Sequence, residues 1–579
     1  MNSYKVLLTL WALLIGCGMM LAAPAKPVPF THVQSDGSTV TLVMSGGERC
    51  HALTTLDGFT VALNEQGDYC YWAAGSLSDV RAHDAGHRGI QEQAFVTAYR
   101  NQLTLESQRR LLPRRDNEEN PSPQVPTMGS PRIPIILVNY TDVKFIDEDP
   151  VVTFEHQFNE KEYSSLHYFE SQSRGLFSPQ FDILGPVELP MDRAYYGGNI
   201  RKFGQDVDKQ LGTMIYDACT GLEGVDFSNY DNDGDGLVDV VVVLYAGVGE
   251  AQAWRYVPES VWPCQWDMKE AKQWGCSTTG PFELNGVTID KFAVFNELDG
   301  NNNNSTSIDG VGTFCHEFGH CLGLPDFYDT SSGGNYGMST WDIMDNGCYL
   351  NNSHTPAGYT SYERHFMGWM DLTVPVVNTH YTLDPLGDGG GAVKVVNDAN
   401  PDEYYLLEYR VKSGWDAYLP AEGIMILHVD YDKAAWDNNS PNNDYYHRRM
   451  TLIPADNMLS SSTNRTDLWP QGDLDSLTNN SVPAATVFTG GFMNKPITGM
   501  TVDAASHEAG FWFMRGAALR GDADGDGQVR IADISIIIDY ILSLNPSGLS
   551  LEGADADLDG RISISDVVAI CDYILLGTW

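Results

Sequence analysis

Two histidines and a glutamate in this sequence could together hold a metal ion and use it in catalysis. His316 and His320 stand four residues apart, so on a helix their rings project from one face and can bind one Zn²⁺. Glu317 lies beside them and is not needed as a ligand. It can therefore take a proton from a zinc-bound water, whose pKa the metal lowers to about 7, and pass it to the leaving amine of a cleaved peptide. This spacing predicts zinc-dependent hydrolysis of peptide bonds, with Glu317 as the general base.

The residues after His320 supply a candidate third ligand. Gly323 can end the helix in a left-handed conformation, and Pro325 prevents the helix from resuming. The chain then turns back, so that Asp326 can complete three protein ligands and leave the fourth position open. Two alternatives remain open: a more distant carboxylate as the third ligand, or two hydrogen-bonded histidines in a buried helix that binds no metal.

Three acidic loops have the pattern Asp-x-Asp-x-Asp-Gly, which is typical of calcium sites. Carboxylates on alternate residues converge on one hard cation, and the glycine makes the sharp turn that the loop needs. Two loops near the C-terminus are twelve residues long, and their predicted calcium ligands are Asp522, Asp524, Asp526 and Asp533 in one, and Asp555, Asp557, Asp559 and Asp566 in the other. The third loop has Val242 at position twelve, so it is either a calcium site or a solvated acidic turn. Its candidate ligands are Asp231, Asp233, Asp235 and Asp239.

Hydrophobic patterning indicates the elements that must position these residues. The predicted strands are 133–138, 238–245, 404–408 and 423–429, and the predicted helices are about 202–219 and 310–322. Near the C-terminus, residues 531–542 recur 33 residues later as 564–575, with a helix-like apolar pattern in each copy. Cys571 takes the place of Ile538 in this repeat and is expected to be a buried apolar position. The chain is therefore predicted to be a multidomain α/β protein.

The segment that contains the zinc motif resembles a known family of enzymes. With Met344 in the turn that follows, the motif looks like that of a metzincin-type endopeptidase, in which this methionine lies as a hydrophobic floor under the metal. The surrounding sequence resembles the immune inhibitor A family of secreted metallopeptidases, in the segments 134–142, 168–173, 181–187 and 368–369. The resemblance implies a metzincin-like fold, zinc as a cofactor and proteins or peptides as substrates. It also implies an N-terminal propeptide, to which residues 55–61 are similar.

The paired C-terminal loops resemble a type I dockerin module, in which Asp replaces the terminal Glu of ordinary EF-hands. This resemblance implies a small α-helical module that binds two Ca²⁺ and docks onto a cohesin-like receptor. The candidate contact residues next to the loops are Arg530, Ile531, Ala532, Ser563, Ile564 and Ser565. The alternative is a calcium-stabilised cap with no partner.

The N-terminus has the layout of a secretory signal peptide, because Lys5 precedes an apolar run that is followed by small residues. Cleavage is predicted after Ala25, since Ala23 and Ala25 satisfy the small-residue rule. Lipidation at Cys17 is a minor alternative, and an uncleaved anchor is another. No later segment is long and apolar enough to span a membrane. The mature chain is therefore predicted to be secreted, extracellular or associated with the cell surface.

Arginines and prolines between residues 109 and 131 indicate an exposed linker that proteases would cut. The chain before this linker is then a propeptide, and the protein is a zymogen activated by cleavage near Arg109, Arg110, Arg114 or Arg115. Latency requires a group near the open zinc position. The candidates are Cys50, His51, Cys70 or an acidic side chain, and the sequence does not choose among them.

The charge of the chain excludes several classes of partner. Its 35 Lys and Arg residues stand against 77 Asp and Glu residues, which gives a formal net charge of −42. Nucleic acids and anionic membrane surfaces attract basic proteins and would repel this one. With 42% hydrophobic residues, the chain has enough apolar material for globular domains. The acidic loops account for only part of the excess charge, and surface solubility accounts for the rest.

The sequence thus predicts a secreted zinc endopeptidase with a calcium-dependent docking module. The predicted segments are a signal peptide at 1–25, a propeptide at 26–115, a linker at 116–131, a catalytic domain at 132–375, a β-rich domain at 376–516 and a dockerin-like module at 517–579. The alternative function is a calcium-dependent adhesion or scaffold protein whose peptidase domain is vestigial.

Overall fold

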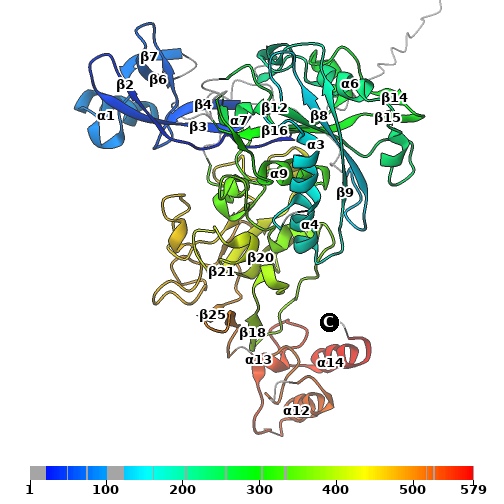
Figure 1. The fold of residues 1–579 in the computed structure, drawn as a ribbon. Helices are drawn as coiled ribbons and strands as arrows, with labels where there is room; N and C mark the ends of the chain where they lie inside the picture. Colours follow the sequence, from blue (N-terminus) through cyan, green and yellow to red (C-terminus); the bar gives the residue numbers. More distant parts are fainter. Residues whose placement is uncertain are drawn as a thin grey trace, which may run out of the picture.

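Four parts of the chain are visible in the computed structural model (Figure 1). It describes residues 21–47, 50–73, 76–100, 103, 123–160, 162–202, 205–253, 257–300, 304–331, 335–516, 518–525, 528–544, 546–577 and 579. An N-terminal lobe lies beside a central α/β part, a β-rich part follows, and a small helical module forms the opposite end. Cys17, Asp526 and the four linker arginines lie outside the described residues, as does most of the predicted signal peptide.

The N-terminal lobe contains two small antiparallel sheets, β2-β3-β4 and β5-β6-β7. Its elements are β2 (Phe30–Val33), β3 (Thr39–Gly47), β4 (Cys50–Thr55), β5 (Val61–Leu63), β6 (Tyr69–Ala73), β7 (Ser76–Arg81) and α1 (Ile90–Tyr99). Val40, Leu42 and Tyr71 belong to a small core of its own. The long β3–β4 hairpin extends from this lobe to the central part (Figure 1).

A mixed sheet in the order β1-β13-β16-β12-β8-β9 forms the centre of the molecule. Its strands are β1 (Leu21–Ala22), β8 (Arg132–Asn139), β9 (Gln180–Glu188), β12 (Val241–Val248), β13 (Cys264–Asp267) and β16 (Lys291–Asp299), with β17 (Ser307–Ile308) paired to β16. Strands β9, β8, β12 and β16 are parallel, whereas β13 is antiparallel to β16. The strands predicted at 133–138 and 238–245 are β8 and β12.

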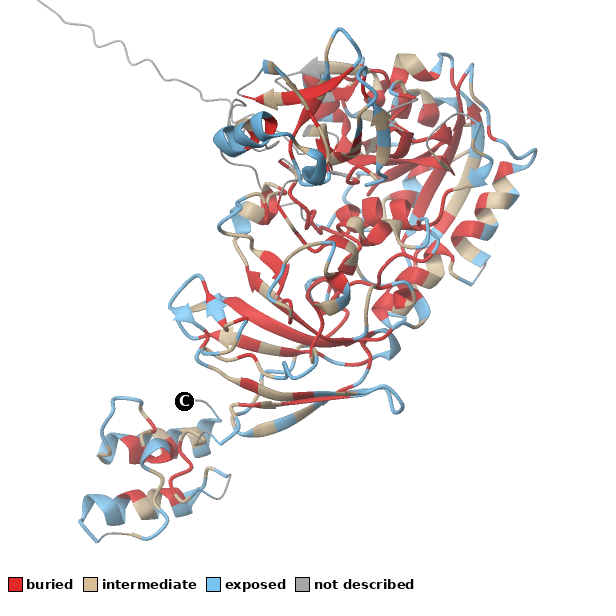
Figure 2. Cartoon of the chain, turned by 90° about the vertical axis from the view of Figure 1, so that its left-hand side faces the viewer, coloured by how far each residue is buried: buried red, intermediate tan, exposed pale blue. Residues whose placement is uncertain are grey.

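Helices cover both faces of this sheet, because alternate strand residues enter two different cores. In β8, Ile135 and Leu137 face one core, whereas Ile136 and Val138 face the other. The first core includes residues of α4 and α9, and the second includes residues of α6 and α8. Buried residues accordingly run through the sheet and its covering helices (Figure 2). The helices of this part are α3 (Pro150–Glu155), α4 (Ser165–Ser173), α5 (Arg193–Tyr196), α6 (Leu211–Gly221), α7 (Glu250–Ala253), α8 (Met268–Trp274), α9 (Gly312–Cys321) and α10 (Ser361–Phe366).

The helix predicted at about 202–219 begins later than expected. Strands β10 (Asn199–Lys202) and β11 (Gln205–Asp208) pair as an antiparallel ladder, and α6 follows them. Within this ladder, the β-branched residues Ile200 and Val207 are direct cross-strand partners. Such residues pack well on a pleated surface, which explains why a strand pair replaces the first turns of the predicted helix.

The β-rich part shares a core with the central part. One face of its four-stranded sheet β19-β20-β21-β22 contributes Tyr404 and Leu406 to the core that lies under α9. The other face contributes Tyr405 and Leu407 to a core shared with the sheet β18-β26-β25. The elements are β18 (Thr379–Leu383), β19 (Val393–Asn397), β20 (Asn400–Arg410), β21 (Gly423–Asp430), α11 (Lys433–Asp437), β22 (Met450–Leu452), β23 (Thr486–Val487), β24 (Gly491–Phe492), β25 (Ile497–Asp503) and β26 (Glu508–Phe513).

The C-terminal module contains α12 (Ile531–Ile541), α13 (Leu551–Ala554) and α14 (Ile564–Leu576). Helices α12 and α14 are the two copies of the predicted repeat, and Ile537 and Ile570 belong to their common core. Cys571 is half-buried and packs against this core, in partial agreement with the prediction. Among the described residues, no helix is both long enough and apolar enough to cross a bilayer.

Candidate metal centre

Three side chains of the predicted zinc motif converge at the end of α9. The range of α9, Gly312–Cys321, confirms the helix predicted at 310–322. Nε2 of His316 lies 3.2 Å from Oδ1 of Asp326, and Nε2 of His320 lies 3.3 Å from the same oxygen. All three side chains are fully buried. The helical spacing of the histidines and the turn after the helix together produce this arrangement.

Backbone carbonyls orient the two imidazole rings. Nδ1 of His316 lies 2.7 Å from the carbonyl oxygen of Ile343, and Nδ1 of His320 lies 2.8 Å from that of Leu324. Gly323 has a φ of 94°, so the turn that returns Leu324 toward the helix uses a conformation that glycine favours. Contacts at Nδ1 determine that Nε2 is the nitrogen that each ring offers to a metal.

The converging atoms fit a cation with nitrogen and oxygen ligands. Nε2 of His316, Nε2 of His320 and Oδ1 of Asp326 are buried and make no hydrogen bond to any described group outside this trio. Buried polar atoms without partners are costly, and a bound cation would satisfy all three. Burial raises the pKa of Asp326, yet the charges and hydrogen bonds of His320 and His316 hold that pKa well below its usual range. Two imidazoles and one carboxylate are a donor set that zinc accepts.

Glu317 is fully buried beside these candidate ligands. Its Oε1 accepts a hydrogen bond of 2.8 Å from the backbone N–H of Ala23. The carboxylate therefore already contacts a peptide amide, which is the group that a proton donor to a leaving amine must reach.

Residues 21–26, here called the cleft segment, run through the site. Strand β1 pairs antiparallel with the edge strand β13 and places Ala22 opposite Cys264. Two further hydrogen bonds hold the backbone of this segment. Trp262 Nε1 donates to the carbonyl oxygen of Ala23 at 3.0 Å, and the Tyr349 hydroxyl donates to that of Pro24 at 2.7 Å. Lys26 Nζ also forms an ion pair of 2.7 Å with Asp299. The cleft segment is thus held as an added strand on the sheet edge next to the candidate metal centre.

The three side chains considered for latency lie in different places. His51 stacks on Trp262 with ring centroids 5.0 Å apart, so it contacts a residue that binds the cleft segment. Cys50 begins β4 and pairs with Gly47 across the hairpin. Cys70 lies in the second sheet of the N-terminal lobe, where Asn64 donates to its sulfur. The sequence did not indicate that backbone of the cleft segment, rather than one of these side chains, would contact Glu317.

Met344 packs against α9 at Gly319. A Cβ at Gly319 would lie 2.6 Å from Sδ of Met344, so a larger residue at this helix position would require the Met344 side chain to move. Asp342 accepts a hydrogen bond of 2.7 Å from the Met344 N–H and thereby holds the turn. Burial raises the pKa of Asp342 to about 6, and burial together with Asp342 raises the pKa of Glu363 well above its usual value.

Asn439, which the sequence analysis missed, holds Asp326 from the β-rich part. Its Nδ2 donates to Oδ2 of Asp326 at 2.6 Å, and its Oδ1 accepts from the Asp326 N–H at 2.6 Å. These two bonds leave Oδ1 of Asp326 directed at the histidines. Asn442 of the same loop donates to the carbonyl oxygen of Phe327 at 2.7 Å. No motif marks Asn439, which stands 113 residues away from Asp326 in the sequence.

Three carboxylates gather in each of the acidic loops, with ligand atoms within 4.8 Å of one another. The groups are Asp231, Asp233 and Asp239; Asp522, Asp524 and Asp533; and Asp555, Asp557 and Asp566. Asp533 and Asp566 are fully buried and accept hydrogen bonds from backbone N–H groups on both sides of their loops. Burial raises the pKa of Asp239 to about 6.

In two of the acidic loops, the predicted ligand at the fifth position does not belong to the group of three carboxylates. Asp235 accepts a hydrogen bond of 2.7 Å from the Leu237 N–H, and Asp559 accepts one of 2.8 Å from the Arg561 N–H. Each carboxylate is thus bound by its own turn and lies outside the group of three. Asp526, the fifth residue of the remaining loop, lies outside the described residues.

Two segments of the chain match known families. Residues 137–370 match the family described as "Immune inhibitor A peptidase M6, catalytic domain", and residues 520–575 match the "Dockerin type I domain". The chain therefore contains an immune inhibitor A-type peptidase domain followed by a type I dockerin domain, in agreement with the resemblances seen in its sequence.

The curated relatives match a limited part of the chain. "Immune inhibitor A" of Bacillus thuringiensis subsp. alesti is 25% identical over 289 residues, which cover 41% of this chain and 39% of that protein. "Pre-pro-metalloprotease PrtV" of Vibrio cholerae is 26% identical over 249 residues, which cover 40% of this chain and 26% of that protein. The chain thus spans well under half the length of each of these relatives.

Replacing Asn439 with alanine should weaken metal binding about 10- to 100-fold, because Asp326 would lose both bonds that fix its carboxylate. Zinc affinity measured by chelator competition tests this, and the visible spectrum of the cobalt-loaded protein reports the ligand geometry. Asn443→Ala is the matched control, since Asn443 belongs to the same loop but bonds Thr330 instead. Equal zinc affinity in the two variants would contradict the role of Asn439.

Asp533→Ala and Asp566→Ala should each remove one bound Ca²⁺, because each substitution deletes the buried terminal carboxylate of one loop. Isothermal titration of the full chain with calcium measures the stoichiometry. Asp539→Ala is the control, since Asp539 is an exposed residue of α12 outside both loops. Unchanged calcium stoichiometry in both loop variants would show that these groups of carboxylates bind no calcium.

Proposed function

We propose that this chain is a secreted zinc endopeptidase with a metzincin-like catalytic domain, made as a zymogen and tethered through a calcium-dependent docking module. The observation that carries the proposal is the convergence of three buried ligand atoms beside Glu317, within the segment that matches a peptidase family. The domain boundaries proposed are those predicted from the sequence, except that the latency proposed below requires signal-peptide cleavage before Ala23 instead of after Ala25.

The proposed reaction assigns a separate role to each residue of the site. His316, His320 and Asp326 hold the ion, which when bound would polarise the substrate carbonyl and lower the pKa of a water. Glu317 accepts a proton from that water and delivers it to the nitrogen of the broken peptide bond. The hydrogen bond from the Ala23 N–H to Glu317 supports the second step, because it shows that an amide nitrogen fits within 2.8 Å of the carboxylate.

The proposed latency rests on the cleft segment. A substrate would need the edge of β13 and the carboxylate of Glu317, and both are engaged by residues 21–23. Signal-peptide cleavage after Ala25 would remove these residues, whereas cleavage before Ala23 would keep Ala23 in the site. N-terminal sequencing of the secreted protein therefore decides between the predicted cleavage position and an earlier one.

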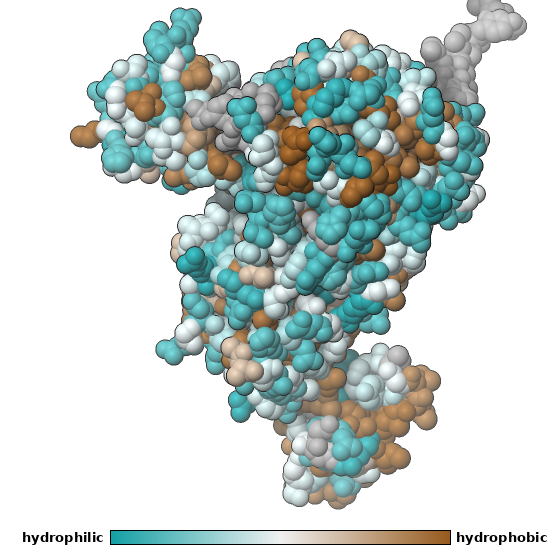
Figure 3. All heavy atoms as spheres, in the orientation of Figure 1, coloured by the Kyte–Doolittle hydropathy of each residue, from teal (hydrophilic) through white to brown (hydrophobic). Residues whose placement is uncertain are grey.

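The proposed partner of the C-terminal module is a cohesin-like receptor. Apolar side chains gather on the surface of this module (Figure 3). They include Ile531 and Ile564, the first residues of α12 and α14, which are 71% and 65% exposed. The duplicated helices would present these residues, together with Arg530, Ala532, Ser563 and Ser565, to the receptor. The type I dockerin match of residues 520–575 supports this assignment.

A calcium-dependent adhesion or scaffold protein with a vestigial peptidase domain is the second candidate. The exposed apolar helices of the module favour it, since they suit a binding role without catalysis. The intact set of His316, Glu317, His320 and Asp326 opposes it, because a site that had lost its chemistry would have no reason to keep unpartnered ligand atoms buried together.

Glu317→Gln should lower casein hydrolysis by at least about 100-fold, because the amide cannot take a proton from water. Zinc content should stay at one ion per chain, since Glu317 is not a proposed ligand. Hydrolysis by the trimmed wild-type protein, with and without a zinc chelator, is the reference. Activity that persists in the variant would reject the mechanism, and inactivity of both proteins would favour the scaffold function.

Full-length protein that retains residues 21–26 should hydrolyse peptides much more slowly than protein cut in the linker, because this cleft segment occupies the substrate position. A fluorogenic peptide assay before and after limited trypsin treatment measures the difference. A variant with Gln in place of Arg109, Arg110, Arg114 and Arg115 should stay latent under the same treatment. Equal activity of the full-length and trimmed proteins would exclude a zymogen.

A further inference from the structure

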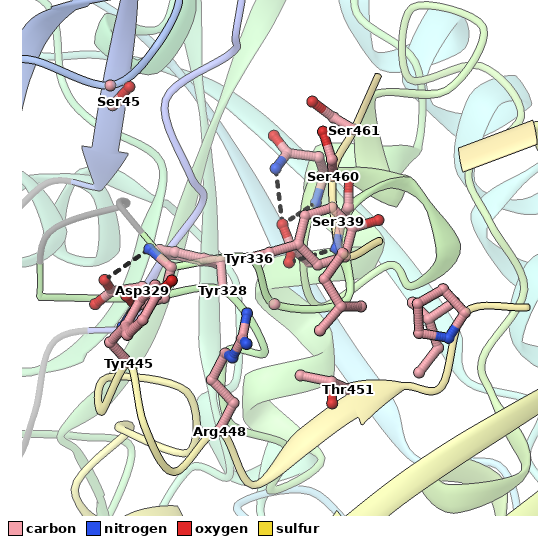
Figure 4. A pocket seen from close by; sticks show the side chains of 18 of the residues that line it. Ser45, Tyr328, Asp329, Tyr336, Ser339, Tyr445, Arg448, Thr451, Ser460 and Ser461 are labelled. Atoms are coloured by element: carbon pink, nitrogen blue, oxygen red, sulfur yellow. Dashed lines mark hydrogen bonds between the residues drawn. The ribbon is translucent and has the colours of Figure 1, made fainter. Parts of the chain in front are cut away.

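A cavity of about 1000 Å³ adjoins the candidate metal centre. One wall follows the metal motif and contains Tyr328, two residues beyond Asp326, and Asp345, which follows Met344. The opposite wall belongs to the β-rich part, and the β3–β4 hairpin closes the third side (Figure 4). Departure of the N-terminal lobe would turn this cavity into an open groove between the central and β-rich parts.

The cleft segment shows which part of a substrate would enter this groove. The proposed mechanism returns a proton from Glu317 to the leaving nitrogen, and the nitrogen that now contacts Glu317 belongs to Ala23. Ala23 therefore occupies the position of the first residue after the cleaved bond. The residues that follow it, Pro24, Ala25 and Pro27, line the cavity. A substrate bound in the same direction would place its second to fifth residues after the cleaved bond in this groove.

Arg448 is a cation in the wall of this groove. It precedes β22, and its guanidinium points into the cavity toward Tyr328 and Tyr336 (Figure 4). The side chain is half-buried and stacks against Tyr445 at 5.5 Å. Its neighbour Arg449 forms an ion pair of 2.8 Å with Asp430, whereas no carboxylate among the described residues pairs with Arg448. Burial lowers the pKa of the Arg448 guanidinium.

The lack of a counter-ion at Arg448 is informative in such an acidic protein. The chain has 77 Asp and Glu residues against 35 Lys and Arg residues, and Asp57, Asp329 and Asp345 line the same cavity, yet none of these three carboxylates pairs with Arg448. Partial burial of a cation without an anion costs free energy, which binding of an anion from outside would recover. On a peptide substrate the available anion is a carboxylate, which a guanidinium can bind through two parallel hydrogen bonds.

We propose that Arg448 selects substrates that carry a carboxylate between the second and fifth residues after the cleaved bond. This specificity rests on the proposed peptidase function and adds to it a residue of the β-rich part. The carboxylate belongs either to an Asp or Glu side chain or to the C-terminus of a short substrate, and these two sources give different cleavage patterns.

Cleavage of a peptide library by the linker-cut enzyme tests the proposal. Sequencing of the products should show enrichment of Asp and Glu at these positions. In Arg448→Gln, the ratio of kcat/KM for an acidic peptide to that for its amide counterpart should fall about 10- to 100-fold, as expected when a hydrogen bond to a charged group is lost. Arg448→Glu should reverse the preference toward Lys and Arg. Arg449→Gln, the matched control with its own partner Asp430, should keep the acidic preference.

Two peptides distinguish the sources of the carboxylate. One has an internal Asp and an amidated C-terminus, and the other has no acidic side chain and a free C-terminus four residues after the cleaved bond. Dependence on Arg448 for the first peptide assigns a side-chain carboxylate, and dependence for the second assigns the terminal one. Cleavage of both peptides without any effect of Arg448 would overturn the inference and leave the peptidase function intact. No cleavage of any peptide would overturn both.

Discussion

The carboxylate of Asp326 has to serve two partners at once, and the rest of the structure follows from this constraint. One oxygen must lie free beside two imidazoles, so the other has to be held firmly. The turn at Gly323 brings Asp326 back toward α9, but it does not fix the side chain. Asn439 does so with two short bonds from the β-rich part. The site therefore depends on two sheets that are packed on one common core, as well as on the helix that bears the motif.

The features that the sequence predicts correctly are those that depend on residues close together in the chain. The four-residue spacing of the histidines, the glycine at 323 and the turn at Met344 all depend on neighbours within one helix or one turn, and the structure has each of them. Strands β10 and β11 were missed, because the pairing of Ile200 with Val207 across the ladder identifies them, and this pairing is not visible in the run of neighbours along the chain. Asn439 could not be found either, because its role depends on how two sheets pack and not on its own neighbours.

The edge of β13 links the resting state with the proposed reaction. An exposed edge strand offers unpaired N–H and C=O groups and accepts any extended chain of suitable direction. Here the protein supplies that chain itself, and Trp262 and Tyr349 secure its carbonyl groups. Such backbone contacts do not depend on side-chain identity. Discrimination among substrates then has to come from side-chain positions farther along the groove.

The N-terminal lobe and the helical module lie at opposite ends of the molecule (Figure 1). If the chain is held through its C-terminal module, cleavage would release the N-terminal lobe from the opposite end. Removal of the lobe would therefore leave the attachment of the enzyme unchanged. An enzyme fixed in this way acts at an effective concentration set by its tether instead of by dilution in the medium. The order of the parts along the chain would thus confine proteolysis to the immediate surroundings of the anchoring site.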